Sequence, residues 1–321
     1  MLIKQLLEVY DVLDDSNASG ETVEAYLRGI RKDADIHVYP LVGPKGKTDM
    51  VKVRIHGSRG KTCGGDAPTL GLLGRLGGLG ARPERIGFVS DGDGALVALS
   101  LAAKLLDMQN KGDILEGDII VSTHVCPDAP TRPHKPVAFM DSPVEMAQVN
   151  KEELSDELDA VLSVDTTKGN RIINTRGFAI SPTVKEGYIL KVSESVLDIM
   201  QTTTGRLPYV YALSVQDITP YGNDLYHLNS ILQPATGTKA PVIGVAITTE
   251  VPVAGCATGA THITDCEEAA RFMLEVAKAY ARGECSFYDE DEFAKIRKLY
   301  GNMNHLQTLG KEAHQDRKSV V

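Results

Sequence analysis

Residues 86–106 read IGFVSDGDGALVALSLAAKLL, and this stretch decides the fold class. Its first part, Ile86 to Ser90, is a short apolar run typical of a buried strand, and Gly94 to Leu106 has the apolar periodicity of a helix. The segment Asp91-Gly92-Asp93-Gly94 between them is typical of a turn followed by a helix N-cap. The stretch therefore predicts a strand, a turn and a helix in succession, which belong to a βαβ unit.

Similar alternation extends in both directions along the chain. Further helices are expected over residues 2–13, 21–31, 188–199 and 266–282, with a short helical core at 70–76 in a glycine-rich segment. Further strands are expected over residues 37–41, 51–56, 118–123, 160–165, 177–183, 209–213 and 242–248. Strands alternating with helices predict an α/β three-layer sandwich, with a mixed, mostly parallel sheet and helices on both faces.

No repeat or proline-rich linker divides the chain, so we expect one α/β domain over residues 1–300, with an N-terminal helical segment and a C-terminal tail over 301–321. Acidic side chains outnumber basic ones by 43 to 34 in the 321 residues, for a net charge of -9. This balance argues against nucleic acid as a partner, because phosphate binding needs a basic surface. Small molecules or peptides are the expected ligands, and a homo-oligomer is one possible assembly.

Cysteine usage and the N-terminus indicate the compartment. The five cysteines are widely spaced and form no CxxC pair, so neither a disulfide framework nor a zinc knuckle is expected. The first 15 residues turn acidic and have no small-residue cleavage site, which favours a helix over a signal peptide. Apolar stretches fall short of the roughly 20 residues that span a bilayer. A cytoplasmic protein with no membrane partner is therefore expected.

Polar side chains follow four successive predicted strands. In open α/β sheets, ligands bind outside the carboxyl ends of the strands. Histidine and carboxylate side chains bind catalytic zinc, and one carboxylate can bridge two ions. Because such side chains follow four successive strands, the sequence predicts a metal site at one edge of the sheet. The strand-end residues are His56, Asp91, His124, Cys126, Asp128 and Asp165.

Each of these residues also has a simpler interpretation. A lone histidine such as His56 is usually a surface or hydrogen-bonded residue after a strand. The segment that begins at Asp91 is a common helix start, and Asp165 can cap the segment after it. Cys126 can be an inert buried thiol, since free cysteine packs as a small apolar residue.

Two loops offer basic side chains to a ligand. Residues 56–65 (HGSRGKTCGG) resemble a phosphate-cradling loop but lack the GxxxxGK[ST] spacing. Residues 127–136 (PDAPTRPHKP) are too rich in proline for a helix or a central strand, so they either present side chains to a ligand or cover the sheet. The substrate-binding candidates on these loops are Arg59, Lys61, Arg132 and His134.

Longer stretches resemble known families. The sequence HGSRGKTCGGDAPTLGLLGRLGGLGARPERIGFVSDGDGA, with THVCPDAPTRPHKP after it, resembles an uncharacterised prokaryotic family known as domain of unknown function 1177. That resemblance covers nearly the whole chain and implies no activity. More remotely, the chain resembles the superfamily of co-catalytic zinc aminopeptidases and carboxypeptidases. This implies a zinc-aminopeptidase-like fold, also called phosphorylase/hydrolase-like, and one or two zinc ions.

The superfamily orders its metal ligands as His, bridging Asp, Glu-Glu, Asp or Glu, and His. His56 is similar in place to the first histidine, and Asp91 to the bridging aspartate. Asp165, in LSVDTT, resembles the aspartate of the DVT motif, and the resemblance implies His262 for the last histidine. Asp224, in YGNDLYHLNS, resembles the aspartate of the GGTDA segment, which implies a place near the substrate.

Two departures affect the implied mechanism. Thr123-His124-Val125-Cys126-Pro127 stands where the superfamily has its glutamate pair, so both the general base and one metal ligand are missing. His262 is displaced to beyond Glu250 and a Gly/Ala-rich turn. General base catalysis, worth about 10² to 10⁴-fold, then requires His124, Asp128 or Glu250 as a substitute.

Three hypotheses follow. The first is a metal-dependent hydrolase of a peptide or small amide, in which zinc activates water, His124 or Asp128 accepts the proton, and Cys126 or Asp128 completes the site. Its metal ligands are His56, Asp91, Asp165 and His262. The second is a non-catalytic small-molecule or peptide-binding protein on a degenerate peptidase fold. The third is a thiol enzyme that uses Cys126 with His124.

Overall fold

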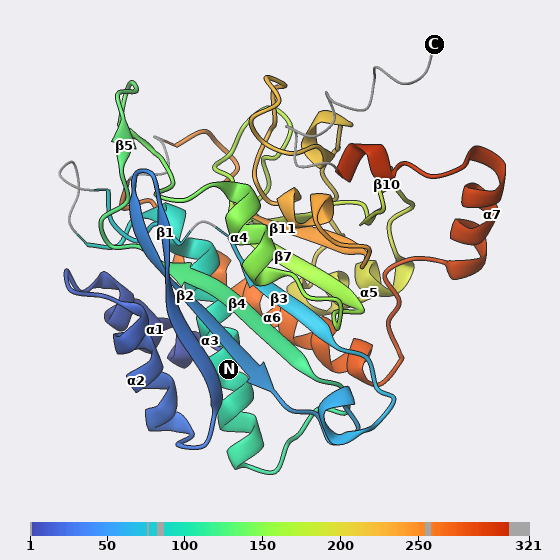
Figure 1. Ribbon diagram of the computed structural model, residues 1–321, viewed down its shortest axis with the longest axis horizontal. Coiled ribbons are helices and arrows are strands. Elements are labelled where there is room, and N and C mark those ends of the chain that lie inside the picture. Colours follow the sequence, from blue (N-terminus) through green and yellow to red (C-terminus); the bar gives the residue numbers. More distant parts are fainter. Residues whose placement is uncertain (1, 76, 82–86, 254–257, 308–321) are drawn as a thin grey trace.

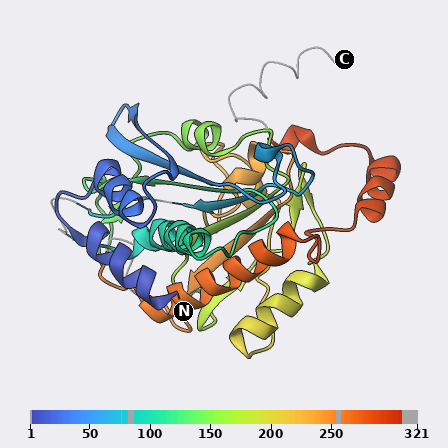
Figure 2. The same ribbon diagram turned by 90° about the horizontal axis from the view of Figure 1, so that it is seen from below.

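The structure is a computed structural model that describes residues 2–75, 77–81, 87–253 and 258–307. A nine-stranded sheet forms its middle layer, between helices on one face and a mixture of helix and loop on the other (Figures 1 and 2). The helices are α1 (Ile3–Asp14), α2 (Gly20–Ile30), α3 (Asp93–Asn110), α4 (Met146–Glu153), α5 (Glu194–Thr204), α6 (Ile263–Ala281) and α7 (Glu290–Tyr300). Within the described ranges, no helix is long and apolar enough to span a bilayer.

The order of the large sheet is β1-β2-β4-β3-β7-β11-β9-β10, with β8 also paired to β11. The left-hand and central strands are β1 (Asp35–Gly43), β2 (Gly46–Ile55), β4 (Ile119–Val125), β3 (Leu70–Gly74), β7 (Ala160–Thr166) and β11 (Val242–Thr248). The remaining strands are β8 (Gly177–Ile180), β9 (Val184–Lys185), β10 (Tyr188–Ile189) and the separate hairpin β5 (Thr131–Arg132) and β6 (Phe139–Met140). Strands β4, β3, β7 and β11 are parallel to one another, whereas the flanking pairings are antiparallel. The predicted mixed α/β sandwich, with parallel strands at its centre, is confirmed.

The two faces of the sheet bury different cores, because successive side chains of a strand point to opposite faces. Leu70 and Leu72 of β3 belong to the large core under α1, α3 and α6. Leu73 belongs to a smaller core that contains Ile231 and Leu232. This second face is covered by α4 and by the segment 205–240, which holds two short 3-10 helices (Figure 2). Helices therefore cover both faces, but unevenly.

Several predicted boundaries are wrong. Residues 70–76 were expected to be helical, but 70–74 form β3, the strand between β4 and β7. The described part of the expected strand 86–90, residues 87–90, is not a strand and ends in the 3-10 helix Ser90–Gly92; Ile86 lies outside the described residues. The expected strand 209–213 is reduced to an isolated bridge from Val210 to Ile180.

Other differences lie towards the C-terminus. The helix expected over 188–199 begins only at Glu194, because Tyr188 and Ile189 pair with β9 as β10. Helix α7 was not anticipated. It stands away from the rest of the molecule (Figure 1), and Phe293 is its one buried residue. Of the expected tail, residues 301–307 are described, and the Gln307 amide donates to the carbonyls of Ala235 and Thr238.

Helix α3 begins in contact with the carboxyl ends of two parallel strands. A Cβ atom on Gly94 would lie 2.5 Å from the carbonyl oxygen of Arg75 and 2.7 Å from that of Val164. The Arg75 amide itself donates to the Val164 carbonyl at 2.8 Å. Glycine at position 94 therefore lets the helix start against the backbone that carries the strand-end side chains.

We expect Gly94→Ala to lower the free energy of unfolding by about 1 to 3 kcal/mol, because the added methyl group forces the helix from the sheet. Gly29→Ala is the matched control, since nothing lies within 4 Å of the added atom. At this exposed position of helix α2 the change should stabilise by about 0.5 to 1 kcal/mol. Urea unfolding followed by circular dichroism measures both. Equal free energies for the two variants would contradict the close contact at Gly94.

Candidate functional site

Three polar side chains form a row across adjacent parallel strands. Leu73 of β3 pairs with Ser122 of β4 and with Ser163 of β7. Two residues further along each strand are therefore Arg75, His124 and Asp165, all on the face of the sheet that packs under α4. The relative exposure of these residues is 1%, 4% and 1%. They mark the carboxyl edge of the sheet, which is the usual place for a ligand site.

Asp165 is held by neighbours and is close to a second carboxylate. Its Oδ2 accepts a hydrogen bond from Ser230 Oγ at 2.5 Å, and its Oδ1 accepts one from the Thr166 amide. Burial, and then the charge of Asp91, raises the pKa of Asp165 well above its usual range, whereas the charge of Arg75 lowers it. Asp91 itself is 5% exposed, in the short turn before α3. The charges of Asp91 and Asp165 therefore interact, although Asp91 lies in a turn and not at the end of a strand, where it was expected.

Arg75 joins the row to the layer above it. Its Nη1 is paired with Glu153 Oε2 at the end of α4, and the side-chain exposures are 1% and 0%. Burial raises the pKa of Glu153, and the Arg75 charge opposes that rise. Because guanidinium stays protonated, a fixed positive charge lies inside the protein beside Asp165 and His124.

Both ring nitrogens of His124 are already in use. The Gly77 amide donates to Nε2 at 3.3 Å, so Nε2 is the acceptor and Nδ1 carries the proton. Nδ1 then donates to Thr48 Oγ1 at 2.8 Å, and that hydroxyl donates to the Val125 carbonyl. Burial, followed by the charge of Arg75, lowers the pKa of His124 to about 3. This arrangement opposes the predicted role of His124 as a general base.

The depressed pKa predicts a loss of stability in acid. Folded His124 stays neutral down to about pH 3, while an unfolded histidine binds a proton below about pH 6.5. The unfolded state therefore binds more protons in this window, and lowering the pH from 7.5 to 5.5 should cost about 1.4 kcal/mol through this residue. Unfolding curves of wild type, His124→Gln and the exposed-residue control His134→Gln measure it. The hypothesis fails if His124→Gln retains the pH slope of the control.

Cys126 is buried rather than reactive. It is 2% exposed in a small cluster with Ala81 and Met140, and its thiol donates weakly to the Lys47 carbonyl at 3.6 Å. Burial raises its pKa to about 11, so almost none of it is thiolate at neutral pH. The predicted nucleophile therefore has the properties of the simpler interpretation, an inert buried thiol.

Alkylation should separate the thiols. Cys63 is exposed, whereas Cys126 is buried. Treatment of the native protein with iodoacetamide at pH 7.5, followed by peptide mass mapping, should label Cys63 and leave Cys126 unlabelled. Unfolding in urea before treatment is the control and should label both. Equal labelling of both thiols in the native protein would contradict the inert state of Cys126 and support its role as a nucleophile.

His56, Arg59 and Lys61 lie at the other end of the sheet. Strand β2 is antiparallel to β4 and pairs Ile55 with Ile119, the first residue of β4. The expectation that His56 shares an edge with Asp165 is therefore wrong. Its Nε2 lies 3.2 Å from Asp35 Oδ2 instead.

The loop 56–65 surrounds an internal carboxylate. Asp118 accepts hydrogen bonds from the amides of Gly57 and Thr62 and from the Thr62 hydroxyl, at 2.8 to 2.9 Å. The basic side chains are paired as well, Arg59 with Asp66 and Glu116, and Lys61 with Asp159. The amide, hydroxyl and basic groups that would bind a phosphate are therefore already paired with carboxylates of the same chain.

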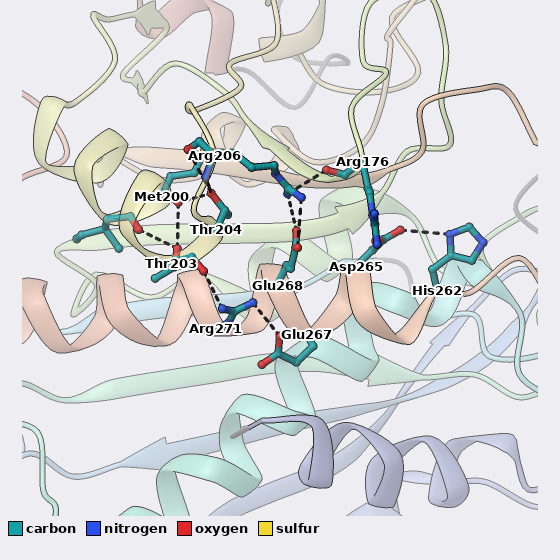
Figure 3. A network of polar contacts seen from close by, with 11 residues as sticks. Arg176, Met200, Thr203, Thr204, Arg206, His262, Asp265, Glu267, Glu268 and Arg271 are labelled. Carbon is teal, nitrogen blue, oxygen red and sulfur yellow. Dashed lines mark hydrogen bonds and ion pairs between the residues drawn. The ribbon is translucent and has the colours of Figure 1, made fainter.

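His262 lies at the carboxyl edge but is turned towards its own helix. It is the N-cap residue of α6, and Figure 3 shows its ring directed at Asp265, with 3.2 Å between Nδ1 and Oδ2. The preceding residue, Thr261, donates to Asp93 Oδ1 at 2.7 Å. Asp93 is fully buried and also pairs with Lys168 at 3.5 Å. These contacts hold the segment before α6 against the start of α3.

The other candidates lie on surrounding loops. Arg132 makes two 2.8 Å hydrogen bonds to Asp141 within the β5–β6 hairpin, and His134 Nδ1 lies 3.2 Å from the Val137 carbonyl. Asp224 has a φ of 63° at an exposed turn. Asp128 and Glu250 are exposed beyond β4 and β11. No contact on the described residues joins these side chains into one site.

The residues present do not fit zinc. In the described ranges, no three His, Cys, Asp or Glu side chains gather as they would around a metal ion. Of the four expected ligands, Asp91 and Asp165 are close, whereas His56 lies at the opposite end of the sheet and His262 faces Asp265. The fixed charge of Arg75 lies near Asp165. A guanidinium beside carboxylates offsets part of the negative charge that would attract a divalent cation.

Sequence reasoning missed several residues of this edge. Arg75 follows the apolar run LGLLG directly, a signal for a strand-end residue that reading the run as a helix concealed. No sequence motif indicated that Glu153 would lie at this edge. Tyr221 and Ser230 lie in the segment that resembles GGTDA, but no role was predicted for them. Burial, and then the charge of Asp165, raise the pKa of Tyr221, whereas the charge of Arg75 and a hydrogen bond with Ser230 lower it.

The family is defined by comparison with known proteins. Residues 41–310 match the family described as "Protein of unknown function (DUF1177)", and the chain belongs to that family. No curated protein matches the chain. The chain is similar to the crystal structure of a glutaminyl cyclase from an Acidobacteriales bacterium, with 15% identity and a TM-score of 0.48. The alignment covers 88% of this chain and 94% of that one. Neither activity nor ligands transfer at this level of similarity.

Proposed function

We propose that this protein is a non-catalytic binding protein for a small molecule or peptide, with its ligand site at the carboxyl edge of the central sheet. One observation supports this proposal: the polar side chains of the row are already hydrogen-bonded or ion-paired to other residues of the chain. His124 uses both nitrogens, Arg75 is paired with Glu153, and Asp165 accepts from Ser230. No described side chain of the row is free to take a proton from an attacking water.

The rim of this edge favours a ligand with an amino group. The exposed residues that follow β11 or lie on the loop 221–230 include the acidic side chains Glu250 and Asp224. The loop 221–230 reaches the row at Ser230, which donates a hydrogen bond to Asp165. Lys168, which follows β7, is paired with Asp93. An amine or a peptide N-terminus therefore complements the exposed charge.

Thermal shift measurement with free amino acids, amino-acid amides and dipeptides tests the binding function. A ligand at 100 times its Kd stabilises by about 2.7 kcal/mol, so its melting temperature should rise clearly. Asp224→Asn with Glu250→Gln should weaken that shift by removing rim charge. Asp66→Asn, an exposed change at the opposite end of the sheet, is the matched control and should leave it intact. An equal loss in both variants would contradict the rim as the site.

Turnover distinguishes binding from catalysis. Chromogenic amino-acid p-nitroanilides, incubated with the wild type in the presence and absence of zinc, should be hydrolysed no faster than in buffer alone. Hydrolysis above that background that disappears in Asp165→Asn would overturn the binding function and favour the metal-dependent hydrolase. Chelator added to the same reaction then shows whether that activity depends on metal.

A further inference from the structure

His227 lies in the loop 221–230, and acceptor oxygens lie next to both of its ring nitrogens. Nδ1 is 3.0 Å from the carbonyl oxygen of Leu225. Nε2 is 3.0 Å from the carbonyl oxygen of Thr219 and 3.1 Å from the hydroxyl oxygen of the same residue. A carbonyl oxygen only accepts hydrogen bonds, so the contact with Leu225 requires a proton on Nδ1. Nε2 requires one too, unless the Thr219 hydroxyl donates to it.

The Thr219 hydroxyl already has other partners. It donates to the carbonyl of Gln216 at 2.8 Å and accepts from the side-chain amide of Asn223 at 2.9 Å. If it turned to donate to His227, it would lose the Gln216 carbonyl, and the lone pair of Nε2 would still face the Thr219 carbonyl. An imidazolium ring, which donates from both nitrogens, satisfies all of these oxygens at once.

The contact with Thr219 ties the loop to a fixed point. The Thr219 carbonyl also accepts a hydrogen bond from the side-chain amide of buried Gln233 at 2.8 Å. Further along, Ser230 donates to Asp165 in the row. The ring of His227 therefore holds the middle of the loop closed, between one anchor at Thr219 and another at Asp165.

The neighbours of the ring are compatible with a positive charge. Tyr221 meets it edge-on, with 4.7 Å between the ring centroids, and burial raises the pKa of Tyr221, so this phenol stays neutral. Asp217, in the 3-10 helix before the loop, accepts a hydrogen bond from the main-chain amide of Leu228 at 2.8 Å. Its negative charge, next to His227 along the chain, favours the protonated ring. Asp224, also acidic and on the same loop, is exposed to water.

We propose that His227 closes the loop 221–230 as an imidazolium, so that raising the pH releases the loop from the row. A histidine in water loses this proton above about pH 6.5. Because the closed loop holds the proton and the open loop releases it, closure weakens above that pH, by up to about tenfold for each pH unit. The consequence for ligand binding rests on the proposed function, since this loop carries Asp224 of the rim.

Hydrogen exchange of three loop amides measures closure. The amides of Tyr221, Leu225 and Leu228 donate to side-chain oxygens at 3.1, 3.0 and 2.8 Å. After correction for intrinsic exchange rates, their protection in the wild type should be constant below about pH 6.5 and should fall by up to about tenfold from pH 7 to pH 8. Protection that does not change over this range overturns the proposal.

His227→Gln removes the titrating group. A glutamine side chain cannot gain a proton at this pH, and it donates from one end only. The loop amides of this variant should exchange with a protection that is independent of pH. His134→Gln is the matched control, because His134 is exposed on the β5–β6 hairpin, and it should keep the wild-type pH dependence. A His227→Gln variant that keeps this dependence contradicts the proposal.

Nitrogen-15 chemical shifts of the His227 ring in the wild type give the protonation state without any variant. At pH 7 both nitrogens should have the shifts of protonated nitrogen, whereas a histidine in water is mostly neutral. A bare Nε2 in the ordered loop overturns the proposal. These measurements use no ligand. A loop with the expected pH dependence in a protein that binds no amine contradicts the proposed function alone, so the two failures are distinguishable.

Discussion

The buried ion pair between Arg75 and Glu153 is the contact on which the carboxyl edge depends. It joins the end of β3, in the middle of the sheet, to the end of α4 above it. Removing one partner of such a pair typically costs about 3 to 5 kcal/mol, because the other charge is left buried and unpaired. The pair therefore determines both where α4 lies and which charge is present beside Asp165.

The row beside this pair shows how burial can remove reactivity from residues that have catalytic chemistry. Histidine, cysteine and aspartate all act as bases, acids or nucleophiles in hydrolytic sites. Here burial, and then the charge of Arg75, keep His124 neutral, and both of its ring nitrogens are hydrogen-bonded. Cys126 is kept protonated by burial. The same residue types at an edge open to water would have ordinary pKa values and free lone pairs.

The sequence predicted the α/β class well, because apolar periodicity reports directly which residues face a core. It placed Asp91 and Asp165 at one edge because each follows a predicted strand, but only Asp165 lies on a strand; Asp91 lies in the 3-10 turn Ser90–Gly92 before α3. It failed at β3, whose five residues (LGLLG) are too short and too glycine-rich for periodicity to separate a strand from a helix. Because β3 was predicted as a helix, Arg75 was not expected at this edge, and His56 was expected there instead. Strand direction depends on pairing between distant segments, so the reversal of β2 could not be predicted locally.

The loop around Asp118 has a consequence for how this protein interacts with anions. Its amides and hydroxyl bind a carboxylate that the chain itself supplies, that of Asp118, directly before β4 begins at Ile119. An intramolecular partner acts at an effective concentration in the millimolar range or above, and its encounter needs no diffusion. Free phosphate competes poorly with such a tethered partner. The glycine-rich loop is therefore poorly suited to bind phosphate or nucleotides, because its donors already bind Asp118. A motif search that finds this loop finds an anion site that the chain itself fills.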